Sequence, residues 1–409
     1  MSADIRGSLD NCVKCTICET FCPVAQATPL FPGPKYAGPQ SERYREPGTS
    51  VDASLDYCSG CGICTQVCPQ GVDIAEINAR ARAQMRTERG MPLRDRLIAR
   101  PTLVGRLAQP VAPVANAVMR TGLARRAAES ALGIHRDAAL PSFSVRTLQS
   151  RARRRRRPGG ATRTVVYFHG CAANYNEPDV GMMAIEVLEH NGFEVIVPPQ
   201  GCCGLPLQSN GNFRPARSYT RELVSRLAPL ARDGHMIVAN STSCGLMLKR
   251  EAREILGIDD PDLALVGERM FDICELLRDL DDAGELRTDF HPLPMRVPYH
   301  QPCQGRGHGF GKPALDLLRL IPELEVIETD RECCGVAGTY GLKKEKYEIA
   351  MRVGASLFAD IAEARADCTA CDSETCRWQI THGTKLPSVH PIDYLHRSYG
   401  LGNGAGHSG

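Results

Sequence analysis

The sequence predicts a mixed fold of the α+β and α/β classes, in which a small helical N-terminal domain precedes two pseudo-symmetric α/β lobes. Three observations support this prediction. The 19 cysteines form two groups, eight between residues 12 and 68 and eleven between residues 171 and 376. The second group repeats one set of spacings. In the same half of the chain, short β-rich runs alternate with helical stretches, which is typical of parallel sheets.

These observations divide the chain into segments. A chain of 409 residues is too long to fold around one ordinary hydrophobic core. We expect a cysteine-rich domain over residues 1–96, a helical connector with an arginine-rich linker over 97–160, a first lobe over 161–290, a second lobe over 291–400 and a flexible tail over 401–409.

Composition and charge exclude some classes of protein. The 49 basic and 47 acidic residues leave a net charge of only +2, and there is one Trp. We therefore expect no nucleic-acid partner, because neither a general positive field nor a base-stacking platform is present. The N-terminal residues lack the apolar core of a signal peptide, and no run of 18 apolar residues occurs. A cytoplasmic location with reduced thiols is expected, in which the cysteines serve as metal ligands.

The N-terminal segment contains two copies of one cysteine motif, Cys-x2-Cys-x2-Cys-x3-Cys-Pro, which begin at Cys12 and Cys58. This spacing is typical of ferredoxins with two 4Fe-4S cubane clusters, where the fourth cysteine of each run binds the other cluster. The segment is therefore expected to be a helical, two-cluster ferredoxin-like domain. The expected ligand sets are Cys12, Cys15, Cys18 and Cys68 for one cluster, and Cys58, Cys61, Cys64 and Cys22 for the other.

Two other interpretations of these motifs are less consistent with the spacing. Structural zinc sites also use four thiolates, but usually as two separated Cys-x2-Cys pairs. A disulfide framework is disfavoured in a cytosolic chain. Three close cysteines with a remote fourth, present twice, favour iron-sulfur clusters.

The second cysteine group contains an internal repeat. Thirty residues separate Cys171 from the pair Cys202-Cys203, and 29 separate Cys303 from the pair Cys333-Cys334. Adjacent cysteines followed by glycine are poor disulfide partners but suit thiolates that bind neighbouring irons. The alternative for each set is a group of buried structural thiols. The predicted sites comprise Cys171, Cys202, Cys203 and Cys244 in the first lobe, and Cys303, Cys333, Cys334 and Cys376 in the second.

Several nearby residues have open roles. Cys368 and Cys371 lie close to Cys376 in sequence and could supply an additional ligand, whereas Cys274 is expected in the core. Three histidines flank the first cysteines of the repeats, and either orient ligands or are ordinary satisfied polar groups. They are His169, His300 and His308.

Longer strings show a family resemblance. NCVKCTICETFCPV, FPGPKYAGPQSER, CCGLPL, CCGVAGTYGLKKE and ETCRWQI resemble the iron-sulfur subunit family of anaerobic glycerol-3-phosphate dehydrogenases, from residue 11 to about residue 393. The general plan is similar to iron-sulfur subunits of heterodisulfide reductase, glycolate oxidase and lactate-utilisation complexes. The strings AGTYGLKKE and ETCRWQI favour the glycerol-phosphate family.

The resemblance implies an electron-transfer subunit without a substrate site of its own. It would accept electrons from flavin-containing dehydrogenase subunits that oxidise glycerol 3-phosphate, and pass them towards membrane quinone. The resemblance also implies two cubanes and one or two further, noncubane 4Fe-4S clusters in the lobes. The chain departs from the usual closing Cys-x-x-Cys motif, because Ser241 and Ser373 occupy its first position. Serine is a weaker iron ligand than thiolate, so a full noncubane site requires another donor, such as Cys371.

Alternative functions remain open at this point. The chain could be a heterodisulfide-reductase-like enzyme, a 2-hydroxy-acid (glycolate or lactate) oxidase iron-sulfur subunit, or a structural or sensing iron-sulfur protein. Membrane contact is also open. The arginine run at 151–157 and the amphipathic segment 103–123 would act together as weak peripheral anchors on the inner face of the cell membrane. The alternative is a solvated linker beside a packed helix.

Overall fold

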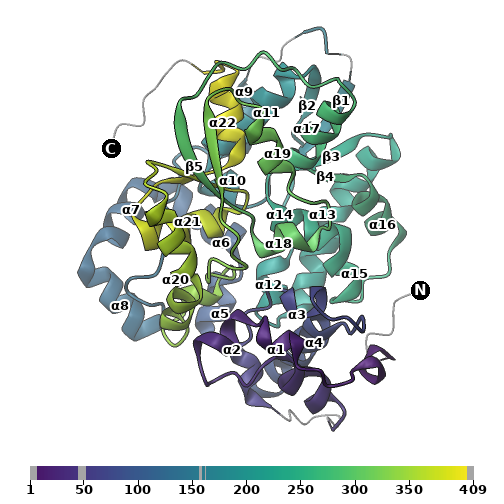
Figure 1. Cartoon of the computed structure of the whole chain (residues 1–409), viewed down its shortest axis with the longest axis vertical. Helices are drawn as coiled ribbons and strands as arrows, with labels where there is room; N and C mark the ends of the chain where they lie inside the picture. Colours follow the sequence, from purple (N-terminus) through teal and green to yellow (C-terminus); the bar gives the residue numbers. More distant parts are fainter. Residues whose placement is uncertain (1–6, 45–51, 156–158, 162, 403–409) are drawn as a thin grey trace.

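The computed structural model describes residues 7–44, 52–155, 159–161 and 163–402. Residues 403–409 of the expected tail, and Arg156 and Arg157 of the arginine run, lie outside the described residues. A helical N-terminal part is followed by two four-stranded parallel sheets (Figure 1). The predicted mixed fold class, with its two pseudo-symmetric lobes, is therefore confirmed.

The N-terminal part folds around its two cysteine motifs. Its α-helices are α1 (Ile17–Thr20), α2 (Pro23–Ala27), α3 (Ile63–Gln66) and α4 (Ile74–Arg89). The helices α1 and α3 begin at equivalent places in the two motifs. Each follows a residue with left-handed backbone, Thr16 at φ +68° and Gly62 at φ +81°. This reversal curls each loop before the third cysteine of its motif, which lies in the following helix.

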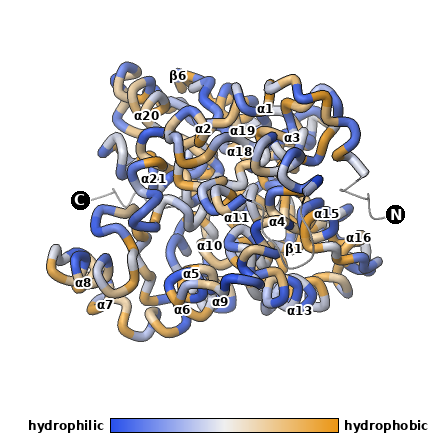
Figure 2. The backbone as a smooth tube through the Cα atoms, turned by 90° about the horizontal axis from the view of Figure 1, so that it is seen from below, coloured by the Kyte–Doolittle hydropathy of each residue, from blue (hydrophilic) through white to orange (hydrophobic). Residues whose placement is uncertain are grey.

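The connector consists of short helices, which are α5 (Leu93–Ile98), α6 (Pro101–Ala108), α7 (Ala112–Arg120), α8 (Gly122–Leu132) and α9 (Leu148–Arg154). Two of them, α6 and α7, have a proline in their first turn. Proline is tolerated in a first helical turn because its missing N–H would have no intrahelical partner there. At Gly105, α6 packs so closely on Tyr175 that an added Cβ would lie 2.5 Å from the ring. In contrast, α7 and α8 lie at the periphery of the molecule (Figures 1 and 2).

The first lobe is a parallel sheet with strand order β2-β1-β3-β4. Its strands are β1 (Arg163–Phe168), β2 (Phe193–Ile196), β3 (Met236–Ala239) and β4 (Met270–Asp272). Its helices are α10 (Ala172–Tyr175), α11 (Pro178–His190), α12 (Leu205–Ser209), α13 (Phe213–Arg232), α14 (Thr242–Leu246), α15 (Ala252–Glu254), α16 (Pro261–Glu268) and α17 (Ile273–Asp282).

The second lobe repeats this topology with strand order β6-β5-β7-β8, again all parallel. Its strands are β5 (Met295–His300), β6 (Leu324–Glu328), β7 (Thr369–Cys371) and β8 (Ser388–Val389). Its helices are α18 (Cys303–Gly307), α19 (Pro313–Arg319), α20 (Tyr347–Glu363), α21 (Glu374–Thr384) and α22 (Pro391–Ser398). The repeated cysteine spacing thus reflects a repeated fold, in which β5 corresponds to β1 and β7 to β3.

The two lobes share one apolar core. α11 of the first lobe packs against α22 of the second, and α17 packs against α19. Tyr167 and Tyr299, at equivalent places in β1 and β5, are both buried in this core. Because the lobes pack on each other through these helices, the loops at the carboxyl ends of their strands face a common space.

A buried ion pair joins the connector to the second lobe. Lys343 Nζ lies 3.0 Å from Asp95 Oδ2 of α5 and donates to Asn210 Oδ1 at 2.8 Å. The Arg94 guanidinium also donates to the Asp95 carboxylate, at 3.0 Å. Burial alone would raise the pKa of Asp95, but the Lys343 ammonium and the Arg94 guanidinium outweigh it and the pKa is lowered. Asp95 is therefore ionised and ties three parts of the chain together at one point.

We expect Asp95→Asn to lower the free energy of unfolding by about 3–5 kcal/mol, because it leaves the buried Lys343 ammonium without its partner. Urea unfolding at pH 7 measures this loss. The pKa of Asp95 is lower in the folded chain than its usual value of about 4, so its stabilisation is present above that pH and is lost on acidification. The difference between wild type and variant should therefore shrink below about pH 4.

The control is Asp137→Asn, because the Asp137 side chain is 60% exposed and lies 3.8 Å from the Arg136 guanidinium. It should change stability by less than about 0.5 kcal/mol. Equal effects of the two substitutions would show that the Asp95–Lys343 pair does not stabilise the fold.

Candidate metal centres

The first predicted ferredoxin-type set is assembled in the structure. Its four cysteines line one small cavity in the N-terminal part. Cys68 comes from the second motif and reaches the first, as the crossover predicts. Lys14 and Thr16, between these cysteines, both have positive φ, which curls the loop around the sulfurs. The residues brought together are Cys12, Cys15, Cys18 and Cys68.

The second set is also brought together, and Cys22 of the first motif reaches it. Burial raises the pKa of Cys22 to about 12, and the neighbouring Cys58 thiol adds to the increase. Burial, followed by repulsion from nearby thiols, also raises the pKa of Cys61 and Cys64. Such thiols are protonated without a cation nearby, and bound iron would supply the positive charge that allows them to ionise. This donor set fits an iron-sulfur cluster.

In the first lobe, the predicted thiols lie at the carboxyl ends of β1 and β3 and in the loop before α12. Cys203 Sγ lies 3.4 Å from Cys244 Sγ. The Cys171 thiol lies within hydrogen-bonding reach of Cys202. Cys202 Sγ accepts a hydrogen bond from the Gly204 amide at 3.5 Å. All four cysteines therefore form one chain of contacts.

The second lobe repeats this arrangement. Cys334 Sγ lies 3.0 Å from Cys376 Sγ, and Cys303 lies within reach of Cys333. The Gly335 amide donates to Cys333 Sγ at 3.3 Å, as Gly204 does to Cys202 in the first lobe. The equivalence of the two lobes thus extends to individual sulfur contacts.

A cavity of about 560 Å³ connects three of the four cysteine sets. It lies between the N-terminal part, the connector and both lobes. All 19 cysteines lie in the described part of the chain and are free thiols, so none of them forms a disulfide. The cysteines that line the cavity are Cys58 and Cys61 of the ferredoxin-type domain, Cys171, Cys203 and Cys244 of the first lobe, and Cys303, Cys333, Cys334 and Cys376 of the second.

The additional cysteines near the second lobe have different surroundings. The Cys371 thiol is fully buried beside Cys376 and within its hydrogen-bonding reach, in an apolar cluster with Leu357 and Ile380. Cys368 instead packs in the core shared by the lobes and points its thiol at the Thr369 carbonyl. Cys274 is also in that core, as expected. Of the two additional candidates, Cys371 is therefore the one placed beside the predicted ligands.

The three histidines differ as well. His169 Nδ1 lies 2.6 Å from the Gly170 carbonyl oxygen, and His308 Nε2 lies 2.8 Å from the Thr242 carbonyl oxygen. Both rings are thus hydrogen-bonded near the first-lobe cysteines. His300 is almost completely buried and its two ring nitrogens lack a hydrogen-bond partner in the described part of the chain. Of the three histidines, only His300 therefore has both ring nitrogens without a hydrogen-bond partner among the described residues, and it lies beside the second-lobe thiols.

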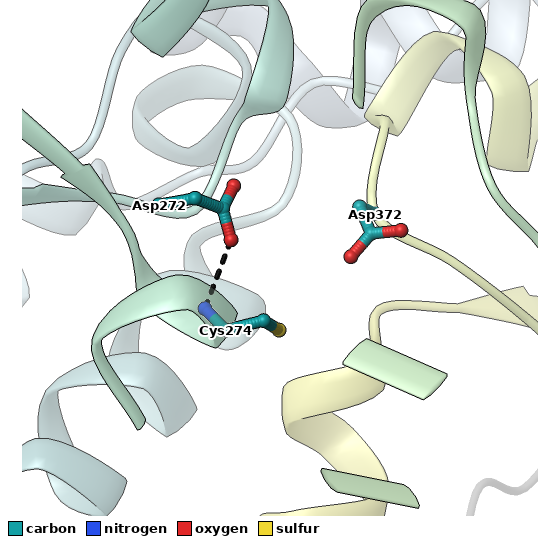
Figure 3. Close-up of side chains that lie close together, drawn as sticks. All are labelled: Asp272, Cys274 and Asp372. Atoms are coloured by element: carbon teal, nitrogen blue, oxygen red, sulfur yellow. Dashed lines mark hydrogen bonds between the residues drawn. The ribbon is translucent and has the colours of Figure 1, made fainter. Parts of the chain in front are cut away.

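A separate buried group lies where the lobes meet, and no local sequence pattern predicts it (Figure 3). Ligand atoms of Asp272, Cys274 and Asp372 all lie within 4.8 Å of one another. Asp272 caps α17 by accepting a hydrogen bond from the Cys274 amide at 2.9 Å, and Asp372 accepts one from the Tyr299 hydroxyl at 2.8 Å. Burial raises the pKa of both carboxyls, and each has a structural partner that explains its position.

Comparisons with known proteins agree with this geometry. The family model described as 4Fe-4S dicluster domain matches residues 8–72, and the one described as Cysteine-rich domain matches residues 165–249 and 297–381. The chain is 39% identical to a subunit of the anaerobic glycerol-3-phosphate dehydrogenase of Escherichia coli K12, over 95% of this chain and 98% of that protein. The chain belongs to the family of this dehydrogenase subunit. It is therefore an iron-sulfur protein with several 4Fe-4S clusters.

More distant relatives share part of the plan of this glycerol-3-phosphate dehydrogenase subunit family. The chain is 26% identical to Lactate utilization protein A 1 of Bacillus mycoides, over 57% of the chain and 94% of that protein. It is also 26% identical to a subunit of the dihydromethanophenazine:CoB--CoM heterodisulfide reductase of Methanosarcina barkeri, over 54% of each protein. These similarities match the alternative functions suggested by the sequence, but they cover less of the chain.

The glycine that follows each cysteine pair is required by its surroundings. Gly335 has φ +90°, and a Cβ there would lie 1.9 Å from the Ala350 carbonyl oxygen. We expect Gly335→Ala to displace the Cys333-Cys334 loop and to remove the second-lobe iron signal from the electron paramagnetic resonance (EPR) spectrum. Iron analysis and EPR of anaerobically purified protein measure the effect.

Gly338→Ala is a matched control, since Gly338 also has positive φ (+62°) but its Cβ would meet nothing within 4 Å. This variant should lower the free energy of unfolding only by its backbone strain, about 1–2 kcal/mol, and the protein should retain its iron. A Gly335→Ala protein with unchanged iron content and spectrum would show that this close approach does not shape the site.

Proposed function

We propose that this chain is the electron-transfer subunit of a quinone-linked glycerol-3-phosphate dehydrogenase complex. Flavin-containing partner subunits oxidise the substrate, and this chain carries the electrons one at a time towards membrane quinone. The observation that supports this best is the serial placement of the cysteine sets, three of which are joined by one cavity. The sixteen predicted ligand cysteines hold the clusters in this proposal.

The packing suggests an order for the sets. The set with Cys12 has its own small cavity and does not line the large one. The set with Cys61 adjoins the second lobe, since Cys61 and Cys303 are close enough for their charges to influence each other. The helix α18 that carries Cys303 contacts both α3 of the ferredoxin-type domain and α14 of the first lobe. Electrons would therefore pass from the second ferredoxin-type set to the second lobe, and then to the first.

A second candidate function is a disulfide-reducing enzyme. It is supported by the cavity of about 560 Å³ that thiols of both lobes face, and by the partial similarity to a heterodisulfide reductase subunit. The electron-transfer proposal has broader support because the similarity to the glycerol-3-phosphate dehydrogenase subunit covers 95% of the chain.

The electron-transfer proposal predicts that Cys61→Ser removes one ferredoxin-type EPR signal and abolishes quinone reduction by the assembled complex. Reduction of the partner flavin by glycerol 3-phosphate should continue at its normal rate, because the break lies after the flavin. Stopped-flow absorbance of flavin and quinone measures both steps.

Cys274→Ala is the control, because Cys274 is buried in the core between the lobes and does not line the cavity. It should retain quinone reduction. Oxidation of glycerol 3-phosphate by the isolated chain would contradict the proposal. A change in the lobe EPR signals on adding a disulfide would favour the second candidate.

The connector has the properties of a surface that contacts an anionic membrane. No helix in the described part of the chain is long and apolar enough to cross a bilayer. Instead, apolar side chains of α6 and α7 are exposed, among them Leu107 at 70% and Val114 at 65%. Residues 93–155 contain 13 arginines but only three acidic residues, whereas the whole chain has a net charge of +2. Exposed apolar residues within a basic segment favour anionic lipid headgroups as the partner.

Membrane contact predicts that the double variant Leu107→Glu, Val114→Glu binds vesicles containing phosphatidylglycerol at least tenfold more weakly. This loss corresponds to the burial of one apolar side chain, about 1.5–3 kcal/mol. Co-sedimentation of the full chain with vesicles measures it. Leu320→Glu is the control, since Leu320 is exposed (37%) at the end of α19 in the second lobe. Equal binding by all three proteins would contradict membrane contact through the connector.

A further inference from the structure

The two lobes differ in the donors at equivalent positions. The strings Ser241-Thr242-Ser243-Cys244 and Ser373-Glu374-Thr375-Cys376 follow β3 and β7 at the same places in the repeated fold. Both begin with serine. The second lobe has the Cys371 thiol next to Cys376, whereas β3 of the first lobe ends at Ala239. The first lobe therefore has one thiol fewer.

The first lobe also has fewer thiols that face the cavity. All four predicted cysteines of the second lobe line the cavity, but in the first lobe only Cys171, Cys203 and Cys244 do so. Cys202 accepts a hydrogen bond from the Gly204 amide and does not line the cavity. The usual closing Cys-x-x-Cys motif supplies one donor beyond the four predicted cysteines, and Ser241 occupies its position, so the first-lobe site has room for another donor.

The side chain of Glu374 reaches this position from the other lobe. Its carboxylate oxygens lie 3.1 and 3.4 Å from Ser241 Oγ, where the usual motif has a cysteine. Glu374 is the first residue of α21 in the second lobe, and it lines the same cavity as the first-lobe thiols. Its equivalent in the first lobe is Thr242, so the second-lobe site has no corresponding carboxylate.

The Arg377 guanidinium, which lies near Glu374, is already paired with another carboxylate. Arg377 forms an ion pair with Glu177 and donates to the carbonyl oxygens of Cys371 and Asp372, both at 3.0 Å. Trp378 Nε1 donates to the other Glu177 oxygen at 2.6 Å. Glu177 therefore satisfies Arg377, and the Glu374 carboxylate contacts Ser241 and lies close enough to Cys171 for their charges to influence each other.

From these contacts we infer that Glu374 is an oxygen ligand to the first-lobe iron-sulfur cluster, supplied across the boundary between the lobes. It takes the place of the thiolate that Ser241 does not provide. Carboxylate is a common ligand for iron in proteins. The inference rests on the proposed assignment of the first-lobe cysteines as cluster ligands. It makes the first-lobe site a product of both lobes, whereas the second-lobe site uses thiols of one lobe.

The test uses anaerobically purified full-length protein and three variants: Glu374→Gln, Ser241→Cys and the double variant. Iron and sulfide analysis, EPR and Mössbauer spectroscopy are the measurements. Glu374→Gln should lose about one iron per chain, because the iron that this carboxylate binds is then held by one protein donor fewer. The Mössbauer component of an oxygen-ligated iron should also disappear. In the double variant, the new thiolate should restore the iron content.

Two controls separate the possible outcomes. Glu251→Gln removes another carboxylate that lines the cavity but does not contact Ser241, and it should leave iron and spectra unchanged. Cys203→Ser identifies the first-lobe signal. If Cys203→Ser changes no iron signal, the proposed cluster assignment in this lobe is wrong. If Cys203→Ser changes the signal but Glu374→Gln retains all iron and both spectra, the cluster assignment stands and Glu374 is not a ligand.

Discussion

The convergence of cysteine sulfurs on one cavity is the constraint on which the rest of the structure depends. Parallel strands end at the same edge of a sheet, so the loops after β1, β3, β5 and β7 present their cysteines on one side of each lobe. The lobes then face each other because α11 packs on α22 and α17 on α19. Buried thiolates that repel one another are costly without compensating cations, and bound iron supplies that compensation. The fold brings the sulfurs together, and the clusters make this arrangement stable.

The two lobes share one fold but differ in the donors at their cysteine sites, which indicates that their clusters have different roles. Both lobes keep the cysteine pair, the following glycine and the same sulfur contacts. The second lobe adds Cys371 and adjoins the ferredoxin-type domain, whereas the first lobe receives Glu374 from its neighbour. Different donor sets give clusters different reduction potentials. A difference between the lobes would give electrons a preferred direction through the chain.

Most of the correct predictions follow from local sequence patterns, namely the spacing of the cysteines and the alternation of strands and helices. The crossover of Cys22 and Cys68 follows from the ferredoxin-type motif, because the last cysteine of each run turns away from its own loop. The two parallel sheets follow from alternating strand and helix patterns. In contrast, the contact of Glu374 with Ser241 joins residues 133 positions apart on different lobes. The Asp95–Lys343 pair spans 248 positions. No local pattern marks such contacts, since they depend on how separate units pack.

The same limit applies to single residues near the sites. Cys368 and Cys371 are equivalent by spacing, but only Cys371 ends a strand beside Cys376, while Cys368 turns into the core. The apolar periodicity of α6 and α7 is visible in the sequence, but which of their apolar side chains stay exposed depends on how these helices pack on the rest of the chain.

Whether the four cysteine sets hold iron-sulfur clusters is best measured by iron and acid-labile sulfide analysis, combined with EPR during stepwise reduction of protein never exposed to oxygen. We expect iron and sulfide in equal amounts, above the roughly eight atoms of each that two ferredoxin-type clusters contain, with further reducible signals from the lobes. Zinc in place of iron, iron without sulfide, or no signal beyond the two ferredoxin-type clusters would contradict it.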